Sequence, residues 1–123
     1  MSVQINQYLG FGYILSYSEG MKALNKLHSE EKAEEIQDEY HDSAFNEDIV
    51  EVNGCSMIVD GMNGKYIFFG KIFEKSQNYE HLNTMSMPKV SAKIKKNVQE
   101  QIQLVFGTDF SMKPQITLIT HYR

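Results

Sequence analysis

The sequence predicts an α+β domain with a four-stranded antiparallel sheet and helices on one face of it. Four segments show the period-two alternation of strands and two longer regions show helical spacing of apolar residues, in the order strand, helix, strand, strand, helix, strand. Two right-handed βαβ crossovers around a hairpin then give βαββαβ, the ferredoxin-like split βαβ arrangement. A chain of 123 residues fits one domain, residues 1–123.

The segment that anchors this prediction is Lys65–Lys75, KYIFFGKIFEK, which reads as a central strand. Its apolar side chains alternate between two faces: Tyr66, Phe68 and Ile72 on one, Ile67, Phe69 and Phe73 on the other. A strand at the rim of a sheet with one wet face would not be apolar on both sides. The turn Asp60–Gly64 joins it to a hairpin partner over Cys55–Val59, and 49–52 can add a short strand before that.

The first strand is predicted over Val3–Leu15, where the apolar residues fall on odd positions, so the odd side is expected to be buried. Gly10 and Gly12 lie on the even side beside Tyr8. Glycine within a strand marks a bulge or a close approach of another backbone. We therefore expect a flat, accessible patch that presents Tyr8.

Two helical regions follow from caps and spacing. Ser16 and Glu19 fit a capping box, and an apolar stripe runs to Tyr40 with an interruption at 28–31, which predicts one bent helix or two helices broken near Ser29. The second helix is expected from Pro88, with apolar residues at four-residue spacing and Gly107 as its stop; they are Val90, Ile94, Val98, Ile102 and Val105. The last strand is expected over 115–122.

Composition limits the classes of function. Twelve Lys and Arg against sixteen Asp and Glu give a net charge of −4, which disfavours binding to a phosphate backbone. The start of the chain, MSVQINQY, has no basic and apolar leader, and no apolar run reaches the ~20 residues that span a bilayer. We expect a cytoplasmic protein that does not enter a membrane.

No catalytic or metal-binding motif is recognisable. The four histidines are scattered, Cys55 is the single cysteine, and no pair of His or Cys has the spacing of metal ligands. Cys55 is expected to be a small apolar residue in or beside a strand, and no G-x-S-x-G nucleophile motif occurs. The chain is therefore expected to be non-enzymatic and to need no cofactor.

Charge is segregated along the chain. Nine carboxylates lie between Glu30 and Asp48 with only Lys32 opposing them, whereas a lysine cluster lies near the start of the second helical region, at positions 89–96. The acidic segment is either a solvated helix face or a recognition surface. A recognition surface would bind a basic partner protein or mimic the charge of a nucleic-acid backbone. The expected partner-binding residues are Glu30, Glu31, Glu34, Glu35, Asp38, Glu39 and Asp42, together with Tyr8.

The opening segment 3–17, VQINQYLGFGYILSY, resembles the first strand of small uncharacterised accessory proteins of T4-type tailed phages, and the hairpin at 61–69 resembles them more weakly. The resemblance implies an accessory protein that acts in the cytoplasm of an infected bacterium, where such proteins bind and redirect or inhibit host factors. It supplies no catalytic residue.

The leading hypothesis is a protein-interaction module that binds a host protein or its own copy through the acidic segment, with a homodimer left open. One alternative is a small ligand-binding domain or enzyme whose pocket lies between the sheet and the long loops and uses His41, His81 or Asp60. The other is nucleic-acid binding on the open sheet face, through the aromatic central strand. Net negative charge makes nucleic acid the least favoured partner.

Overall fold

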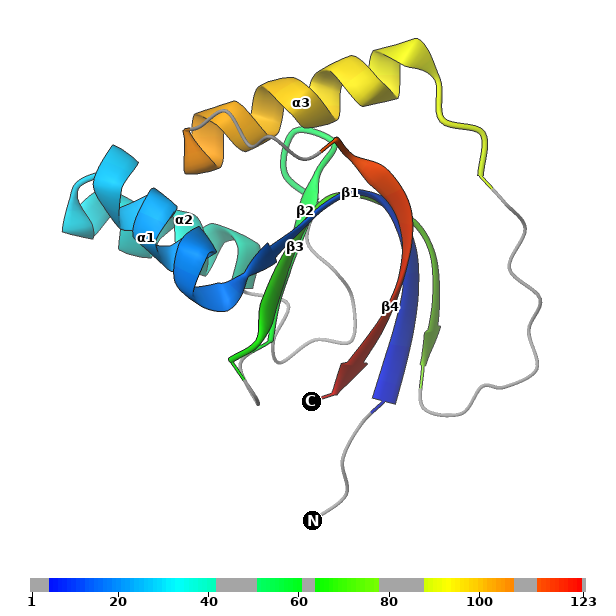
Figure 1. The fold of residues 1–123 in the computed structure, drawn as a ribbon, viewed down its shortest axis with the longest axis horizontal. Helices are drawn as coiled ribbons and strands as arrows, with labels where there is room; N and C mark the ends of the chain where they lie inside the picture. Colours follow the sequence, from blue (N-terminus) through cyan, green and yellow to red (C-terminus); the bar gives the residue numbers. More distant parts are fainter. Residues whose placement is uncertain (1–4, 42–50, 61–63, 78–87, 108–112, 123) are drawn as a thin grey trace.

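A computed structural model describes residues 5–41, 51–60, 64–77, 88–107 and 113–122. Its elements in chain order are β1 (Ile5–Ser16), α1 (Tyr17–Leu27), α2 (Glu30–His41), β2 (Ser56–Val59), β3 (Tyr66–Gln77), α3 (Ala92–Phe106) and β4 (Gln115–Tyr122). Figure 1 shows a strongly curved sheet with the helices gathered on one side of it.

The four strands form one antiparallel sheet in the order β2-β3-β1-β4. The α+β class and the ferredoxin-like arrangement are therefore confirmed. The two central strands, β1 and β3, are also the two longest, at 12 residues each. The apolar side chains on both faces of β3 have a direct explanation, because a buried cluster lies on each face of the sheet: Ile67 and Phe69 belong to one cluster and Phe68 to the other.

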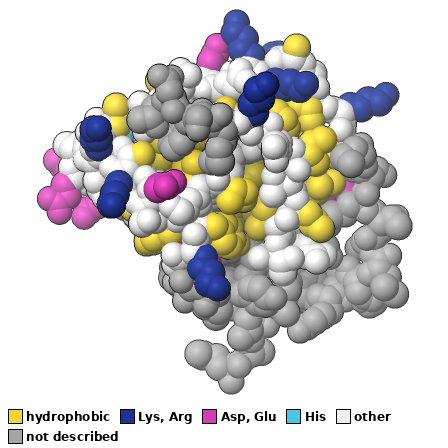
Figure 2. All heavy atoms as spheres, in the orientation of Figure 1, with side chains coloured by type: hydrophobic (Ala, Val, Ile, Leu, Met, Phe, Trp, Pro, Cys, Tyr) yellow, Lys and Arg dark blue, Asp and Glu magenta, His cyan; other side chains and the backbone are white. Residues whose placement is uncertain are grey.

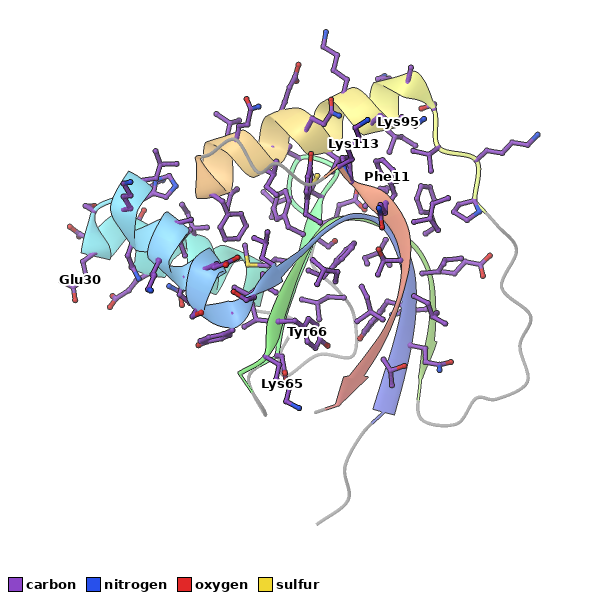
Figure 3. All side chains as sticks on the ribbon, viewed as in Figure 1. Phe11, Glu30, Lys65, Tyr66, Lys95 and Lys113 are labelled. Atoms are coloured by element: carbon purple, nitrogen blue, oxygen red, sulfur yellow. The ribbon has the colours of Figure 1, made fainter. Side chains whose placement is uncertain are left out.

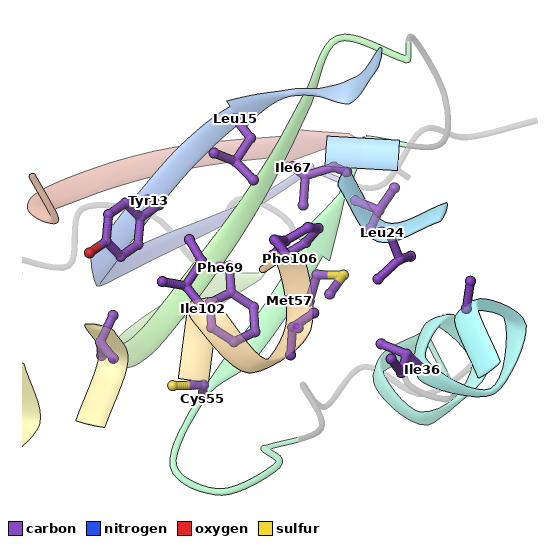
Figure 4. Close-up of a cluster of buried hydrophobic side chains, with 14 of the residues drawn as sticks. Tyr13, Leu15, Leu24, Ile36, Cys55, Met57, Ile67, Phe69, Ile102 and Phe106 are labelled. Carbon is purple, nitrogen blue, oxygen red and sulfur yellow. The ribbon is translucent and has the colours of Figure 1, made fainter. Parts of the chain in front are cut away.

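The main core lies between the sheet and the helices (Figure 4). Three odd-numbered side chains of β1 point into it, as the alternation predicts: Phe11, Tyr13 and Leu15. Ile67 and Phe69 of β3 lie in the same core. The Phe69 ring meets the Phe106 ring of α3 edge to face, with ring centroids 5.7 Å apart and an interplanar angle of 85°. This contact fixes the end of α3 over the middle of the sheet.

The opposite face of the sheet carries a second buried cluster, formed by Tyr8, Ile58, Phe68 and Ile119. The Tyr8 side chain is 1% exposed, so the prediction that it lies on an accessible patch is wrong. The reason is the curvature of the sheet. Side chains on this face converge as the strands bend, and Tyr8 lies among apolar neighbours.

Three glycines on this face allow the bend. Gly12 and Gly70 are paired directly across β1 and β3, and a Cβ on either would clash with the backbone of the other strand. A Cβ on Gly10 would lie 2.9 Å from the ring of Phe68, which packs over that position. The close approach expected from glycine within a strand is confirmed, but the approaching backbone belongs to the same sheet.

The helices begin and end where side chains satisfy backbone groups. The first helical region is two helices, and the break falls at His28 and Ser29, as one of the two alternatives predicted. The backbone N–H of Ile94 donates to the Ser91 hydroxyl at 3.2 Å, so α3 begins after Ser91 and the prediction of a start at Pro88 is wrong. Gly107 ends α3 in the left-handed conformation, at φ 72°.

The region before β2 also differs from expectation. Val52 forms only an isolated bridge with Cys55, across a tight turn whose residue Asn53 has a positive φ of 52°. A short strand over 49–52 is therefore not formed at Val52, and residues 49–50 lie outside the described part of the chain.

Candidate functional site

Helix α2 carries an acidic outer face, which we define as Glu30, Glu31, Glu34 and Glu35. All four side chains are exposed, whereas Ala33 and Ile36 are buried against the core. At ~100° per residue the glutamates occupy roughly 140° of the helix circumference, away from the two buried residues. Figure 3 shows Glu30 directed away from the body of the molecule, and Figure 2 shows acidic side chains gathered at this end.

The other predicted partner-binding residues are not part of this face. The backbone of α2 continues through residues 38–41, but the side chains of Asp38 and Glu39 and the whole of Asp42 lie outside the described residues. Tyr8 lies buried in the cluster on the far side of the sheet. The structure therefore places four of the predicted residues on one surface and separates Tyr8 from them.

The acidic face is not explained by helix stability. Glu30 and Glu31 lie in the first turn, where a negative charge interacts favourably with the helix dipole. Glu34 and Glu35 lie one turn later and are like-charge i,i+4 neighbours of the first two, which costs a few tenths of a kcal/mol per pair. Within the described part of the chain, the one ion pair on this face is Lys32–Glu35, at 3.7 Å between exposed side chains.

Local contacts fix where α2 lies. The backbone N–H of Lys32 donates to the Ser29 hydroxyl at 3.2 Å, which caps the helix start. One residue earlier, the His28 ring Nε2 is 2.9 Å from the Val105 carbonyl oxygen of α3. The α1–α2 corner is therefore tied to the end of α3, and α2 itself packs on α1 and β2.

A second surface, the basic groove, lies between α3 and the turn before β2. It encloses about 530 Å³ and is lined by Gly54, Lys71, Lys93, Ile94, Lys96, Asn97, Val98 and Glu100. Its charges are partly neutralised, because Lys71 donates to both carboxylate oxygens of Glu51 at 3.2 Å. The lysine cluster was visible in the sequence, but its proximity to Gly54 depends on the tertiary fold.

One polar contact fixes the shape of this groove. The Asn97 side-chain amide donates to the Asn53 carbonyl oxygen at 2.8 Å, which joins α3 to the turn. A Cβ on Gly54, whose φ is +80°, would lie 2.8 Å from that amide nitrogen. Asn97 is therefore occupied with a structural bond.

Asp60, one of the residues of the ligand-binding alternative, has a structural role in the hairpin. Its carboxylate accepts a hydrogen bond from the Lys65 N–H at 3.0 Å, and its carbonyl oxygen accepts one from the Gly64 N–H at 2.9 Å. Burial, together with the neighbouring Asp60 and Tyr8, raises the pKa of Tyr66 to about 12. The side chains of the other two residues of that alternative, His41 and His81, lie outside the described residues.

No metal-binding group was located: the described ranges contain no cluster of three or more His, Cys, Asp or Glu side chains with suitable geometry. None of the helices in those ranges is long and apolar enough to cross a membrane. The aromatic strand does not offer stacking platforms in its described middle, because Phe68 and Phe69 are both 0% exposed.

Cys55 is buried in the main core, as expected for a small apolar residue. Burial and the nearby Glu51 raise its pKa from 9.0 to about 11, against the opposing effect of Lys71. The thiolate is the nucleophile, so a thiol with this pKa is almost entirely unreactive near neutral pH. Its burial, at 0% exposure, and its raised pKa both argue against a role for Cys55 as a nucleophile in the folded protein.

We expect the Cys55 thiol to react with Ellman's reagent only when the chain unfolds. Because its pKa is higher in the folded state, the unfolded state loses its proton first, and stability falls as pH rises from about 9 towards 11. The loss is on the order of 2 kcal/mol. Urea unfolding at several pH values measures it, and Cys55→Ala should flatten the profile below pH 10, before the tyrosines ionise. Fast labelling of the native protein at pH 7 would contradict the burial.

No protein-family model, curated protein or solved structure matches this chain significantly.

Proposed function

We propose that this chain is a non-enzymatic protein-interaction module that binds a basic partner protein through the acidic face of α2. The observation that carries the proposal is the arrangement of Glu34 and Glu35, which are exposed, lie next to like charges and contribute nothing to the core. Surface charge that weakens its own helix is better explained by attraction to another molecule than by folding. Such a surface steers a cationic partner and adds specificity.

The position of the face supports the same proposal. Helix α2 packs on the core through Ala33 and Ile36. Among the described residues, the one ion pair on its outer side is Lys32–Glu35, which lies within the helix itself. The resemblance of residues 3–17 to accessory proteins of T4-type phages supports a protein of the infected bacterium as the partner. Binding there would inhibit or redirect that host factor.

Glu34→Lys separates binding from stability. It replaces a repulsive Glu30–Glu34 pair with an attractive i,i+4 pair in the favourable orientation, so the free energy of unfolding should stay level or rise by about 0.5 kcal/mol. Affinity for a basic partner should fall at the same time. The probe is a fluorescent arginine-rich peptide, followed by anisotropy at several salt concentrations, with urea unfolding measured in parallel.

A variant with all four glutamates of the acidic face changed to lysine should lose peptide binding and its salt dependence. The matched control carries the same charge change at four exposed glutamates elsewhere, Glu19, Glu51, Glu74 and Glu100. If both variants lose binding equally, the peptide senses only net charge and the proposed surface is wrong. Retention by the control and loss by the α2 variant support it.

A further inference from the structure

The edge strand β4 is unprotected in a way that the other edge is not. Among the described strands, β4 pairs only with β1, and it runs for eight residues, QITLITHY, without an acidic residue, lysine, arginine or proline. The opposite edge, β2, is four residues long. Proteins usually shorten, charge or cover a sheet edge because its open backbone groups pair readily with another strand.

The side chains of β4 strengthen this contrast. Leu118 is 60% exposed and Ile116 is 41% exposed, and both lie on the helix side of the sheet, opposite Leu9 and Phe11 in the β1 register. Figure 2 shows hydrophobic surface in the region that β4 occupies in Figure 1. An apolar strip beside open backbone groups is typical of a strand that receives a partner strand.

We propose that β4 pairs antiparallel with β4 of a second copy of this chain, giving a two-fold dimer with one continuous eight-stranded sheet. The charge distribution selects a second copy as the partner. The strand carries no fixed charge that would repel its own copy, and the acidic helix α2 packs on β2, at the opposite edge of the sheet. Pairing at β4 therefore keeps the two acidic faces apart, although each chain has a net charge of −4.

Geometry also restricts the register. Opposite residues of antiparallel strands point to the same face, so a two-fold axis perpendicular to the sheet pairs even-numbered with even-numbered residues. Pairing centred on Leu118 overlaps nearly the whole strand. It sets Leu118 against Leu118 of the second copy and Ile116 against Thr120. The exposed apolar strips of the two copies then lie side by side on one face of the joined sheet.

The assembly stops at two copies. A two-fold axis pairs the β4 edge of one copy with the β4 edge of the other, so this contact closes at two copies. Among the described strands, the opposite edge consists of the four-residue β2 and the part of β3 that β2 does not pair with, residues 71–77. That part of β3 carries Lys71, Glu74 and Lys75, and charges on an edge disfavour further pairing. This inference does not depend on the proposed function, because the acidic face is at the other end of the sheet.

The test is the molar mass in solution, measured by sedimentation equilibrium over a wide concentration range. Wild-type protein should be a dimer, and Leu118→Lys should raise the dissociation constant at least about tenfold, because two lysines would face each other across the two-fold axis. Leu104→Lys is the matched control: it makes the same change at a leucine on α3 that is 65% exposed. It should leave the dimer intact.

Cross-linking tests the register independently. Antiparallel partners have Cα atoms within the range that a disulfide spans, so Leu118→Cys should form a disulfide-linked dimer under mild oxidation, while Leu104→Cys should not. The native Cys55 is buried and does not interfere. The proposal is overturned if the wild-type protein is a monomer at all concentrations or grows into open oligomers. It is also overturned if Leu104→Lys dissociates the dimer and Leu118→Lys does not. Reversal of the α2 glutamates should leave the dimer unchanged.

Discussion

Replacing Gly12 by alanine is expected to destabilise the protein by about 3 kcal/mol or more. The added Cβ would clash with the Phe69 carbonyl oxygen and would lie 2.7 Å from the Gly70 Cα. Both obstacles are backbone atoms of the neighbouring central strand, so no side-chain rotation relieves them. The two central strands would have to separate at the point where the sheet bends, and urea unfolding monitored by circular dichroism measures the loss.

The control for this substitution is Gly64→Ala. Gly64 has a positive φ of 63°, but within the described part of the chain no atom other than those of its two chain neighbours lies within 4 Å of the position that an added Cβ would take. Alanine there should therefore cost only the backbone strain, about 1 kcal/mol. Gly70→Ala should resemble Gly12→Ala, because its Cβ would meet the Phe11 carbonyl oxygen and the Gly12 Cα. Equal, small losses at all three glycines would show that the strands do not approach closely.

These glycines also show where sequence reasoning fails. The alternation in β1 correctly predicts which side faces the helices, because period-two spacing is a local property of a strand. Whether the other side is open depends on how strongly the whole sheet coils. Gly12 and Gly70 are 58 positions apart in the chain, and only their pairing shows that the strands cross closely. Tyr8 was therefore expected on a surface and lies in a second core.

The position of β3 could be predicted for a reason that is equally physical. Apolar side chains on both faces are compatible only with a strand that has covered faces, and the turn Asp60–Gly64 forces its hairpin with β2. The helix boundaries predicted from the sequence were less accurate than the position of β3. Ser91, three residues after Pro88, supplies the hydroxyl that caps α3, and capping decides the start.

The candidate surfaces differ in the same way: one depends on local helical spacing and two depend on the tertiary fold. The acidic face of α2 could be predicted because its glutamates and its buried residues are separated by helical spacing within seven positions, Glu30 to Ile36. The basic groove and the open edge of β4 could not. The basic groove forms only when the fold brings Lys71 and Lys93 close to the same turn. The open edge of β4 can be recognised only from the strand order, in which β4 is outermost.

The aromatic centre of the main core carries the second large effect. Phe69 is 0% exposed, lies on central strand β3 and meets Phe106 of α3 edge to face. In the sheet, Phe69 is paired with Tyr13 of β1 and Met57 of β2, so it joins elements that are distant in the sequence. Close-packed surroundings of this kind relax only partly around a missing side chain, and the cavity adds to the lost transfer free energy.

Phe69→Ala is therefore expected to lower the free energy of unfolding by about 3–5 kcal/mol, a large part of the stability of a small domain. Phe73→Ala is the matched control, because Phe73 is on the same strand and face but only half-buried, and it should cost clearly less. Chemical unfolding of both variants gives the comparison. A double-mutant cycle with Phe106→Leu should then show a coupling of about 0.5–1.5 kcal/mol, since the edge-to-face contact is lost once when either ring is removed. Additive losses would mean that the two rings do not interact, and that α3 is held over the sheet by area burial alone.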